Sequence, residues 1–126
     1  MIEDDKDDRY LTEETLVELK IEIPIKFLSE SSNLFEYLST ATRPSLILMD
    51  YNIVPENSIS ILKKLKKDEI LKPIPVVILS ENNLPQYKKE CYEAGASSFI
   101  KKPDTIEGTK QKIASFFNYW FQVAEL

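Results

Sequence analysis

The sequence predicts an α/β fold in which a parallel sheet is covered by helices on both faces. Short apolar runs typical of buried strands alternate five times with segments of helical periodicity. The 126 residues are the size of one ordinary domain, and 43% of them are hydrophobic, which is enough for a real core. We therefore expect residues 1–126 to form one doubly wound domain with a five-stranded sheet.

The expected strands are apolar runs bounded by polar or proline residues, and they lie at Ile2, 23–28, 46–50, 76–79 and 98–101. The expected helices fill the intervals, with an apolar residue every three or four positions, and they cover about 8–19, 32–39, 59–65, 85–95 and 104–124. The opening strand is short, because only Met1 precedes Ile2, and this favours the view that upstream residues are missing.

Several helix boundaries carry recognisable signals. Asp7 or Asp8 is expected to cap the first helix, Pro85 to open the fourth, and Gly95 to end it in a left-handed cap. Gly108 lies inside the last helix at a cost of about 1 kcal/mol relative to alanine. The apolar stripes expected to face the core include Leu11, Leu16, Leu19, Ile59, Leu62, Leu65, Ile113, Phe116, Phe117, Trp120 and Ala124.

The composition excludes several functions. The chain has no histidine, which removes Ser–His and Cys–His nucleophile pairs and histidine metal sites. A net charge of −5 argues against nucleic-acid binding, and no apolar run approaches the length of a membrane span. The single cysteine, Cys91, excludes an internal disulfide and fits a reducing, cytoplasmic environment.

Polar side chains follow four of the expected strands at the point where each strand ends. Glu3 and Asp4 follow Ile2, while Asp50, Ser80 and Lys102 end or follow three later strands. Ligands of open parallel sheets bind outside the carboxyl ends of the strands. Carboxylates suit Mg²⁺, whereas a hydroxyl and an amine suit phosphate oxygens. The combination predicts phosphoryl transfer onto Asp50.

Each of these residues also has an ordinary interpretation. An aspartate after a strand is usually a turn residue or a helix cap, and Ser80 fits the same description. The acidic run 3–8 is typical of a solvated helix start, and Lys102 alone is typical of a surface charge. The functional interpretation depends on all of them standing at strand ends together.

Taken together, the chain resembles a response-regulator receiver domain of two-component signalling over essentially its whole length. The motifs that carry the resemblance are Ile2-Glu3-Asp4-Asp5, Leu46–Asn52, Pro75–Ser80, Glu93-Ala94-Gly95-Ala96 and Phe99–Pro103. The resemblance implies the strand order 2-1-3-4-5. Two positions depart from the family pattern, because Val54 stands where the family usually has proline and Ser58 where glycine is common. The two ends of the chain further resemble small stand-alone receivers associated with phytochrome-like kinases.

By resemblance, Asp50 is the phosphoacceptor, and Glu3, Asp4 and Asp50 hold Mg²⁺ together with the backbone carbonyl of Asn52. Ser80 would be the switch hydroxyl, Phe99 the switch aromatic and Lys102 the phosphate-sensing lysine. These seven positions match the family motifs residue by residue. The resemblance also implies a cis peptide bond between Lys102 and Pro103.

The predicted function is that of a stand-alone receiver, not an enzyme, which takes a phosphoryl group from a sensor histidine kinase or a phosphotransfer protein. It would signal through protein–protein contacts. One alternative is a degenerate receiver that acts as a binding module independent of phosphorylation. A haloacid-dehalogenase-like phosphatase is disfavoured, because Asn52 stands where such enzymes carry an acid–base aspartate. A flavodoxin-like redox protein is disfavoured, because the acidic run at 3–5 would repel a flavin phosphate.

The predicted output surface is the face formed by the last two helices and the last strand. Tyr92, Phe99, Tyr119 and Phe121 are expected there and are harder to bury than their neighbours. Together they would form an apolar patch larger than a monomer usually exposes. We therefore expect homodimerisation through this face, strengthened by phosphorylation.

Overall fold

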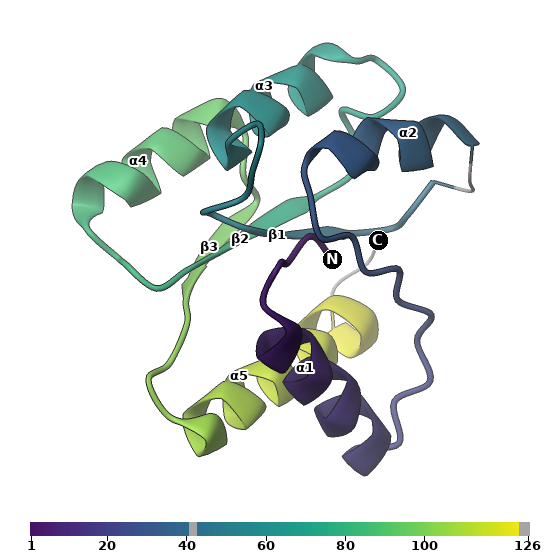
Figure 1. The fold of residues 1–126 in the computed structure, drawn as a ribbon, viewed down its shortest axis with the longest axis vertical. Helices are drawn as coiled ribbons and strands as arrows, with labels where there is room; N and C mark the ends of the chain where they lie inside the picture. The colour runs from purple at the N-terminus through teal and green to yellow at the C-terminus, as the bar shows by residue number, and fades with distance from the viewer. Residues whose placement is uncertain (41–42, 124–126) are drawn as a thin grey trace.

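The computed structural model describes residues 1–40 and 43–123. The helices are α1 (Lys6–Glu18), α2 (Ser32–Thr40), α3 (Ser58–Lys67), α4 (Pro85–Ala94) and α5 (Ile106–Asn118), followed by the π-helix η1 (Tyr119–Val123). The strands are β1 (Ile47–Asp50), β2 (Val76–Ser80) and β3 (Ser98–Lys101). Figure 1 shows α2, α3 and α4 on one face of the sheet and α1 and α5 on the other. The predicted α/β class is confirmed.

The three strands form a parallel sheet in the order β1-β2-β3. All four residues of β1 are buried, and four of the five in β2 are buried, as expected for strands covered on both faces. The main core packs between this sheet and the helices α2, α3 and α4. Its fully buried members include Met49, Ile61, Leu62, Leu65, Val76, Ile78 and Cys91.

Two further positions extend the sheet beyond β1 by single parallel bridges. Ile2 bridges Met49 on one side and Leu28 on the other. The Ile2 N–H donates to the Leu48 carbonyl at 2.8 Å, and the Glu3 N–H donates to the Leu28 carbonyl at 2.9 Å. The spatial order is therefore the predicted 2-1-3-4-5, although Ile2 and Leu28 stand in place of full strands.

The expected strand at 23–28 is wrong except at its last residue, Leu28. A ladder needs a partner with successive free backbone groups. In the segment beside it, the Met1 carbonyl accepts from the Leu28 N–H at 2.9 Å. Pro24 has no N–H to donate. Residues 21–27 consequently cross this edge without strand pairing.

The first helix begins earlier than expected. Asp5, not Asp7 or Asp8, is the N-cap, and its side chain accepts hydrogen bonds from the backbone N–H groups of both. Leu16 is buried as predicted. The prediction for Leu19 is wrong, because the helix ends at Glu18 and Leu19 is a C-cap residue that is 46% exposed.

Later boundaries agree more closely with the sequence. Helix α4 begins at Pro85, and Gly95 caps it with φ of 111°, the left-handed conformation that glycine adopts most easily. Thr105 caps α5, which contains Gly108 as expected. The expected helix 104–124 instead divides at Asn118 into α5 and η1, and Ala124 lies outside the described residues. No helix in the described ranges has the length and apolarity to cross a membrane.

Candidate functional site

The strand-end residues gather at one edge of the sheet. Asp50 is the last residue of β1 and is 8% exposed, Glu3 directly follows the bridge residue Ile2 and is fully buried, and Lys102 directly follows β3. Ladder pairing fixes two of these positions, because Asp50 pairs with Leu79 and the Lys102 N–H donates to the Ser80 carbonyl at 2.7 Å. The predicted convergence of these side chains is what the structure shows.

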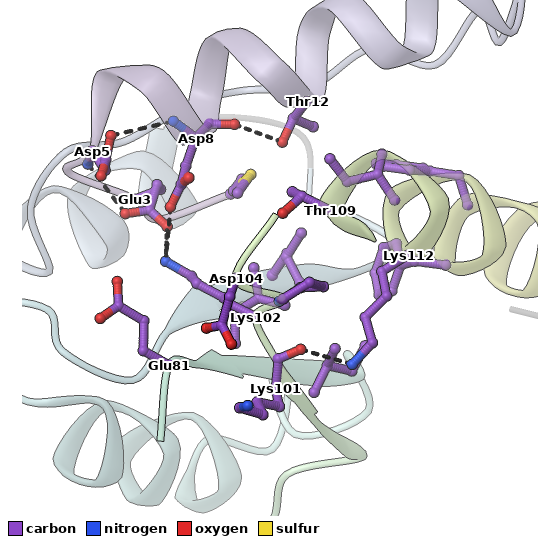
Figure 2. Close-up of a pocket in the computed structure, with 18 residues that line it drawn as sticks. Glu3, Asp5, Asp8, Thr12, Glu81, Lys101, Lys102, Asp104, Thr109 and Lys112 are labelled. Carbon is purple, nitrogen blue, oxygen red and sulfur yellow. Dashed lines mark hydrogen bonds and ion pairs between the residues drawn. The ribbon is translucent and has the colours of Figure 1, made fainter. Parts of the chain in front are cut away.

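Lys102 is the centre of the site. Its Nζ lies 2.8 Å from Glu3 Oε2, 3.0 Å from Asp8 Oδ2 and 3.0 Å from Asp50 Oδ2. Figure 2 shows the ammonium group directed between Glu3 and Asp8, with α1 above it. Three carboxylates thus surround one ammonium group, so the cluster keeps an excess of negative charge.

Asp8 was missed as a member of this cluster. The sequence predicts only a capping role for Asp7 or Asp8, whereas the Asp8 side chain projects from the first turn of α1 onto Lys102. Helical spacing gives no signal for this contact, because Asp4 precedes the N-cap residue Asp5 and lies outside α1.

Burial and charge shift the pKa values of two groups in the site. Burial raises the pKa of the Glu3 carboxyl, the hydrogen bond from Lys102 opposes that rise, and the charge of Asp50 adds to it, giving about 7. For Lys102, burial alone would lower the pKa, but the hydrogen bond to Glu3 and the charges of Asp50 and Glu3 raise it above its usual value. Lys102 therefore stays protonated, whereas keeping the buried Glu3 carboxyl ionised costs free energy.

The acidic residues also form a group that suits a divalent cation. Glu3, Asp4 and Asp50 each offer a carboxylate oxygen, and these oxygens lie within 4.8 Å of one another. Hard oxygen ligands, few in number and with one side open to water, match the preferences of Mg²⁺ and related ions. Asp4 is exposed, which leaves that side accessible. The donor set therefore fits the expected metal.

Asn52 lies where the loop after β1 folds back on Asp50. Its backbone N–H donates to Asp50 Oδ1 at 3.1 Å, which fixes the orientation of the Asp50 carboxylate. The role of the Asn52 carbonyl as a metal ligand stays a prediction.

Ser80 ends β2 and is buried, but its hydroxyl is used by its own loop. Ser80 Oγ donates to the Asn82 carbonyl at 2.7 Å and accepts from the Asn82 N–H at 3.1 Å. Such a turn is the ordinary role of a serine after a strand. Phe99 lies in β3, half-buried, and its N–H donates to the Tyr92 hydroxyl at 3.1 Å. The switch roles of Ser80 and Phe99 stay predictions.

The prediction of a cis Lys102–Pro103 bond is wrong. Within residues 1–40 and 43–123, the cis peptide bond is Val54–Pro55. Lys102 needs no cis bond to reach Asp50, because its backbone continues the ladder of β3 and directs the side chain toward Glu3 and Asp50.

A cavity of about 310 Å³ adjoins the site between α1, β3 and α5. Its polar mouth includes Asp8, Lys102 and Asp104, and Figure 2 shows these side chains around one opening. The apolar floor is formed by Leu48, Leu79, Ile100, Ile113, Phe116 and Phe117. The side chain of Lys102 therefore borders open space on the side of α1.

Comparison with known families and proteins agrees with this geometry. The model of the response regulator receiver domain matches residues 1–114. The two-component response regulator ORR7 of Oryza sativa subsp. indica is 36% identical over 78 residues, which are 62% of this chain and 38% of that protein. The match thus spans well under half of the relative's length.

Solved structures agree over nearly the whole chain. The phosphorylated cyanobacterial phytochrome response regulator RcpA is 27% identical with a TM-score of 0.92, covering 99% of this chain and 94% of that one. The Mn(2+)-bound form of response regulator Rcp1 has a TM-score of 0.91 at 24% identity, with the same coverage, and shows likeness of fold.

Proposed function

Because the chain belongs to the response regulator receiver domain family, we propose that it accepts a phosphoryl group on Asp50 from a histidine kinase or a phosphotransfer protein. The observation that carries the proposal is the position of Asp50 at the end of β1, bonded to Lys102 and grouped with two further carboxylates. The phosphorylated protein would signal through protein–protein contacts. The cytoplasmic location expected from its single cysteine belongs to the same proposal.

The chemistry needs little besides positioning. An oxygen of Asp50 would attack the phosphorus of the donor in line, and the bond from phosphorus to the donor nitrogen would break as the new phosphorus–oxygen bond forms. A carboxylate nucleophile needs no histidine as general base, so the absence of histidine in the chain is no obstacle. The Asn52 N–H orients Asp50 for this attack.

We assign the metal site of this reaction to Glu3, Asp4, Asp50 and the carbonyl of Asn52, with Mg²⁺ as the cation. When bound, the cation would neutralise charge on the phosphoryl oxygens. The closeness of the three carboxylates supports the assignment, as does the Mn(2+)-bound form of the structurally similar response regulator Rcp1.

Ser80, Lys102 and Phe99 would respond to the new group. Ser80 would exchange its two contacts with Asn82 for a phosphoryl oxygen, and Lys102 would pair with another. Phe99, on the neighbouring strand β3 at the expected output surface, would then reorient. The response is a two-state shift driven by contacts that exist only with the phosphoryl group.

The decisive experiment is incubation with the divalent cation and a small acyl-phosphate donor, followed by intact-mass measurement. The parent should gain a single phosphoryl adduct. Asp50→Asn should gain none while keeping the parent's circular dichroism, because the amide has nearly the same shape but cannot accept the group. A parent without an adduct would favour the phosphorylation-independent binding module, and an equally labelled Asp50→Asn variant would place the acceptor elsewhere.

A further inference from the structure

We propose that Asp8 is a positioning residue for Lys102. Asp8 holds the Lys102 ammonium group when Glu3 and Asp50 bind a divalent cation, and it competes with the phosphoryl group for that ammonium group. This inference rests on the proposed function. In this inference, the first turn of α1 affects how readily Asp50 is phosphorylated and how tightly Lys102 binds the phosphoryl group.

The starting point is how the ammonium group shares its bonds. A lysine ammonium has three N–H donors and no acceptor, and here Glu3, Asp8 and Asp50 provide one acceptor each. Two of these partners, Glu3 and Asp50, also belong to the group of carboxylates that suits a cation, whereas Asp8 does not. One lysine contact is therefore independent of the cation site.

Each oxygen of the two shared carboxylates already accepts one hydrogen bond. Glu3 Oε2 accepts from Lys102, and its Oε1 accepts from the Asp5 N–H at 3.1 Å. Asp50 Oδ2 accepts from Lys102, and its Oδ1 accepts from the Asn52 N–H. A cation bound by Glu3 and Asp50 would compete with Lys102 for these carboxylates, and repulsion between like charges favours release of the lysine.

Asp8 is fixed where a displaced lysine can still reach it. Its backbone N–H donates to Asp5 Oδ1 at 3.2 Å, and its carbonyl accepts from Thr12 Oγ at 2.9 Å, so it is anchored in the first turn of α1. The cavity of about 310 Å³ that adjoins both Lys102 and Asp8 gives the lysine stem room to move toward the helix. Figure 2 shows the two side chains facing each other beside that cavity.

Removing the Asp8 charge should then have two opposite effects. Without Asp8, Lys102 loses its alternative partner, so binding of the cation to the unphosphorylated protein weakens. The same loss frees Lys102 for a phosphoryl oxygen, so binding of a phosphoryl mimic strengthens. A general structural defect would weaken both kinds of binding, so the opposite signs are diagnostic.

The experiment compares Asp8→Asn with Asp7→Asn in the full chain. Asp7 is the matched control, because it lies in the same helical turn and the substitution changes the charge equally, but it makes no contact with Lys102. Mg²⁺ alone is titrated first, and beryllofluoride is then titrated at saturating Mg²⁺, both followed by amide chemical shifts. Thermal unfolding of each variant verifies that it is folded.

Relative to Asp7→Asn, we expect Asp8→Asn to weaken Mg²⁺ binding and to tighten beryllofluoride binding, each by about threefold, the size typical of a partly exposed charge pair. In a Lys102→Met background the Asp8→Asn effects should disappear. Equal behaviour of the two asparagine variants, or weakening of both ligands by Asp8→Asn, would overturn the inference. Failure of the parent to bind beryllofluoride would instead contradict the proposed function itself.

Discussion

Two neighbouring parts of the sheet deliver residues to the same site by different means. Strands β1, β2 and β3 pair through continuous registers of four residues each, and they place Asp50 and Lys102 at the edge. The segment at Met1–Glu3 pairs through the single residue Ile2, yet it holds Glu3 fully buried. Continuous pairing is therefore not required to position a side chain, provided that one anchor is completely packed.

The anchor is Ile2, which is 1% exposed and lies in the same core as Met49 and Leu34. Both of its backbone groups bond to β1, since the Ile2 N–H donates to the Leu48 carbonyl at 2.8 Å and the Ile2 carbonyl accepts from the Asp50 N–H at 3.0 Å. One residue thus joins hydrophobic burial to the backbone geometry of both Glu3 and Asp50. In β1, β2 and β3, several paired residues together position the strand ends.

The largest effect should come from removing this anchor. We expect Ile2→Ala to lower the free energy of unfolding by about 2–4 kcal/mol, because a fully buried side chain is lost and a cavity remains. Chemical denaturation of the variant measures the loss.

The control is Ile78→Ala in β2, where an equally buried isoleucine is removed from the continuous ladder. It should cost a similar free energy, but only Ile2→Ala should also weaken Mg²⁺ binding, because Glu3 follows Ile2 directly. Equal weakening by Ile78→Ala would show that the two parts of the sheet position the site in the same way.

A second, smaller effect concerns the helices that cover the continuous strands. Burial raises the pKa of the Cys91 thiol on α4 from its ordinary value of about 9 to about 11, with a further contribution from the charge of Glu90. The folded protein therefore binds more protons than the unfolded chain between these values, so stability falls as the pH rises through them. We expect a decline of at most about 2–3 kcal/mol, complete only above pH 11.

Denaturation curves at several pH values, compared between the parent and Cys91→Ala, isolate this contribution. The variant should lack the corresponding part of the alkaline decline. The native thiol should also resist alkylation at pH 8, whereas the denatured chain should react. Rapid alkylation of the native protein would contradict this expectation, because it would show that α4 opens readily and exposes Cys91.

Most of the fold could be predicted from the sequence, because helix and strand signals in its second half are strong. Pro85 and Gly95 bound α4 as expected, and the runs ending at Asp50 and Ser80 are strands. The first half was less predictable. Residues 23–27 have the composition of a strand, but pairing depends on a partner segment that composition does not reveal.

The site was predictable to the extent that strand ends determine it. Glu3, Asp50 and Lys102 meet as expected, because parallel strands bring their carboxyl ends to one edge. The contact of Asp8 with Lys102 depends on how α1 docks, and the turn that engages the Ser80 hydroxyl depends on loop geometry. Neither follows from the pattern of apolar residues.

A third prediction concerns the cation site, where the two parts of the sheet meet. We expect weak Mg²⁺ binding, of millimolar order, because few protein oxygens and retained waters make such sites loose. Asp4→Asn and Asp50→Asn should each weaken it by about tenfold, and the exposed Asp68→Asn serves as a charge-matched control. An NMR titration that leaves amides next to Asp4 and Asp50 unchanged would contradict the site.

The smallest effect is expected at the predicted dimer face, on α4, β3 and α5 with η1. Tyr92 and Tyr119 are 49% and 52% exposed, and Phe121 is 37% exposed. Phe121 stacks on Phe117 with ring centroids 5.7 Å apart, and it lines a groove with residues 23–26, the segment that forms no strand. Phe121 therefore belongs partly to this groove and not only to the predicted dimer face.

This division makes the dimer prediction testable residue by residue. Sedimentation of Tyr119→Glu, Phe121→Glu and the double variant is compared with the parent, with and without beryllofluoride. We expect Tyr119→Glu to weaken self-association by about fivefold, a loss of roughly 1 kcal/mol for one peripheral aromatic contact, and Phe121→Glu to have less effect because its ring is partly packed. If all four proteins sediment as the same species in both conditions, the face is not a dimer interface. If Phe121→Glu alone has an effect, association instead uses the groove beside the single-bridge edge of the sheet.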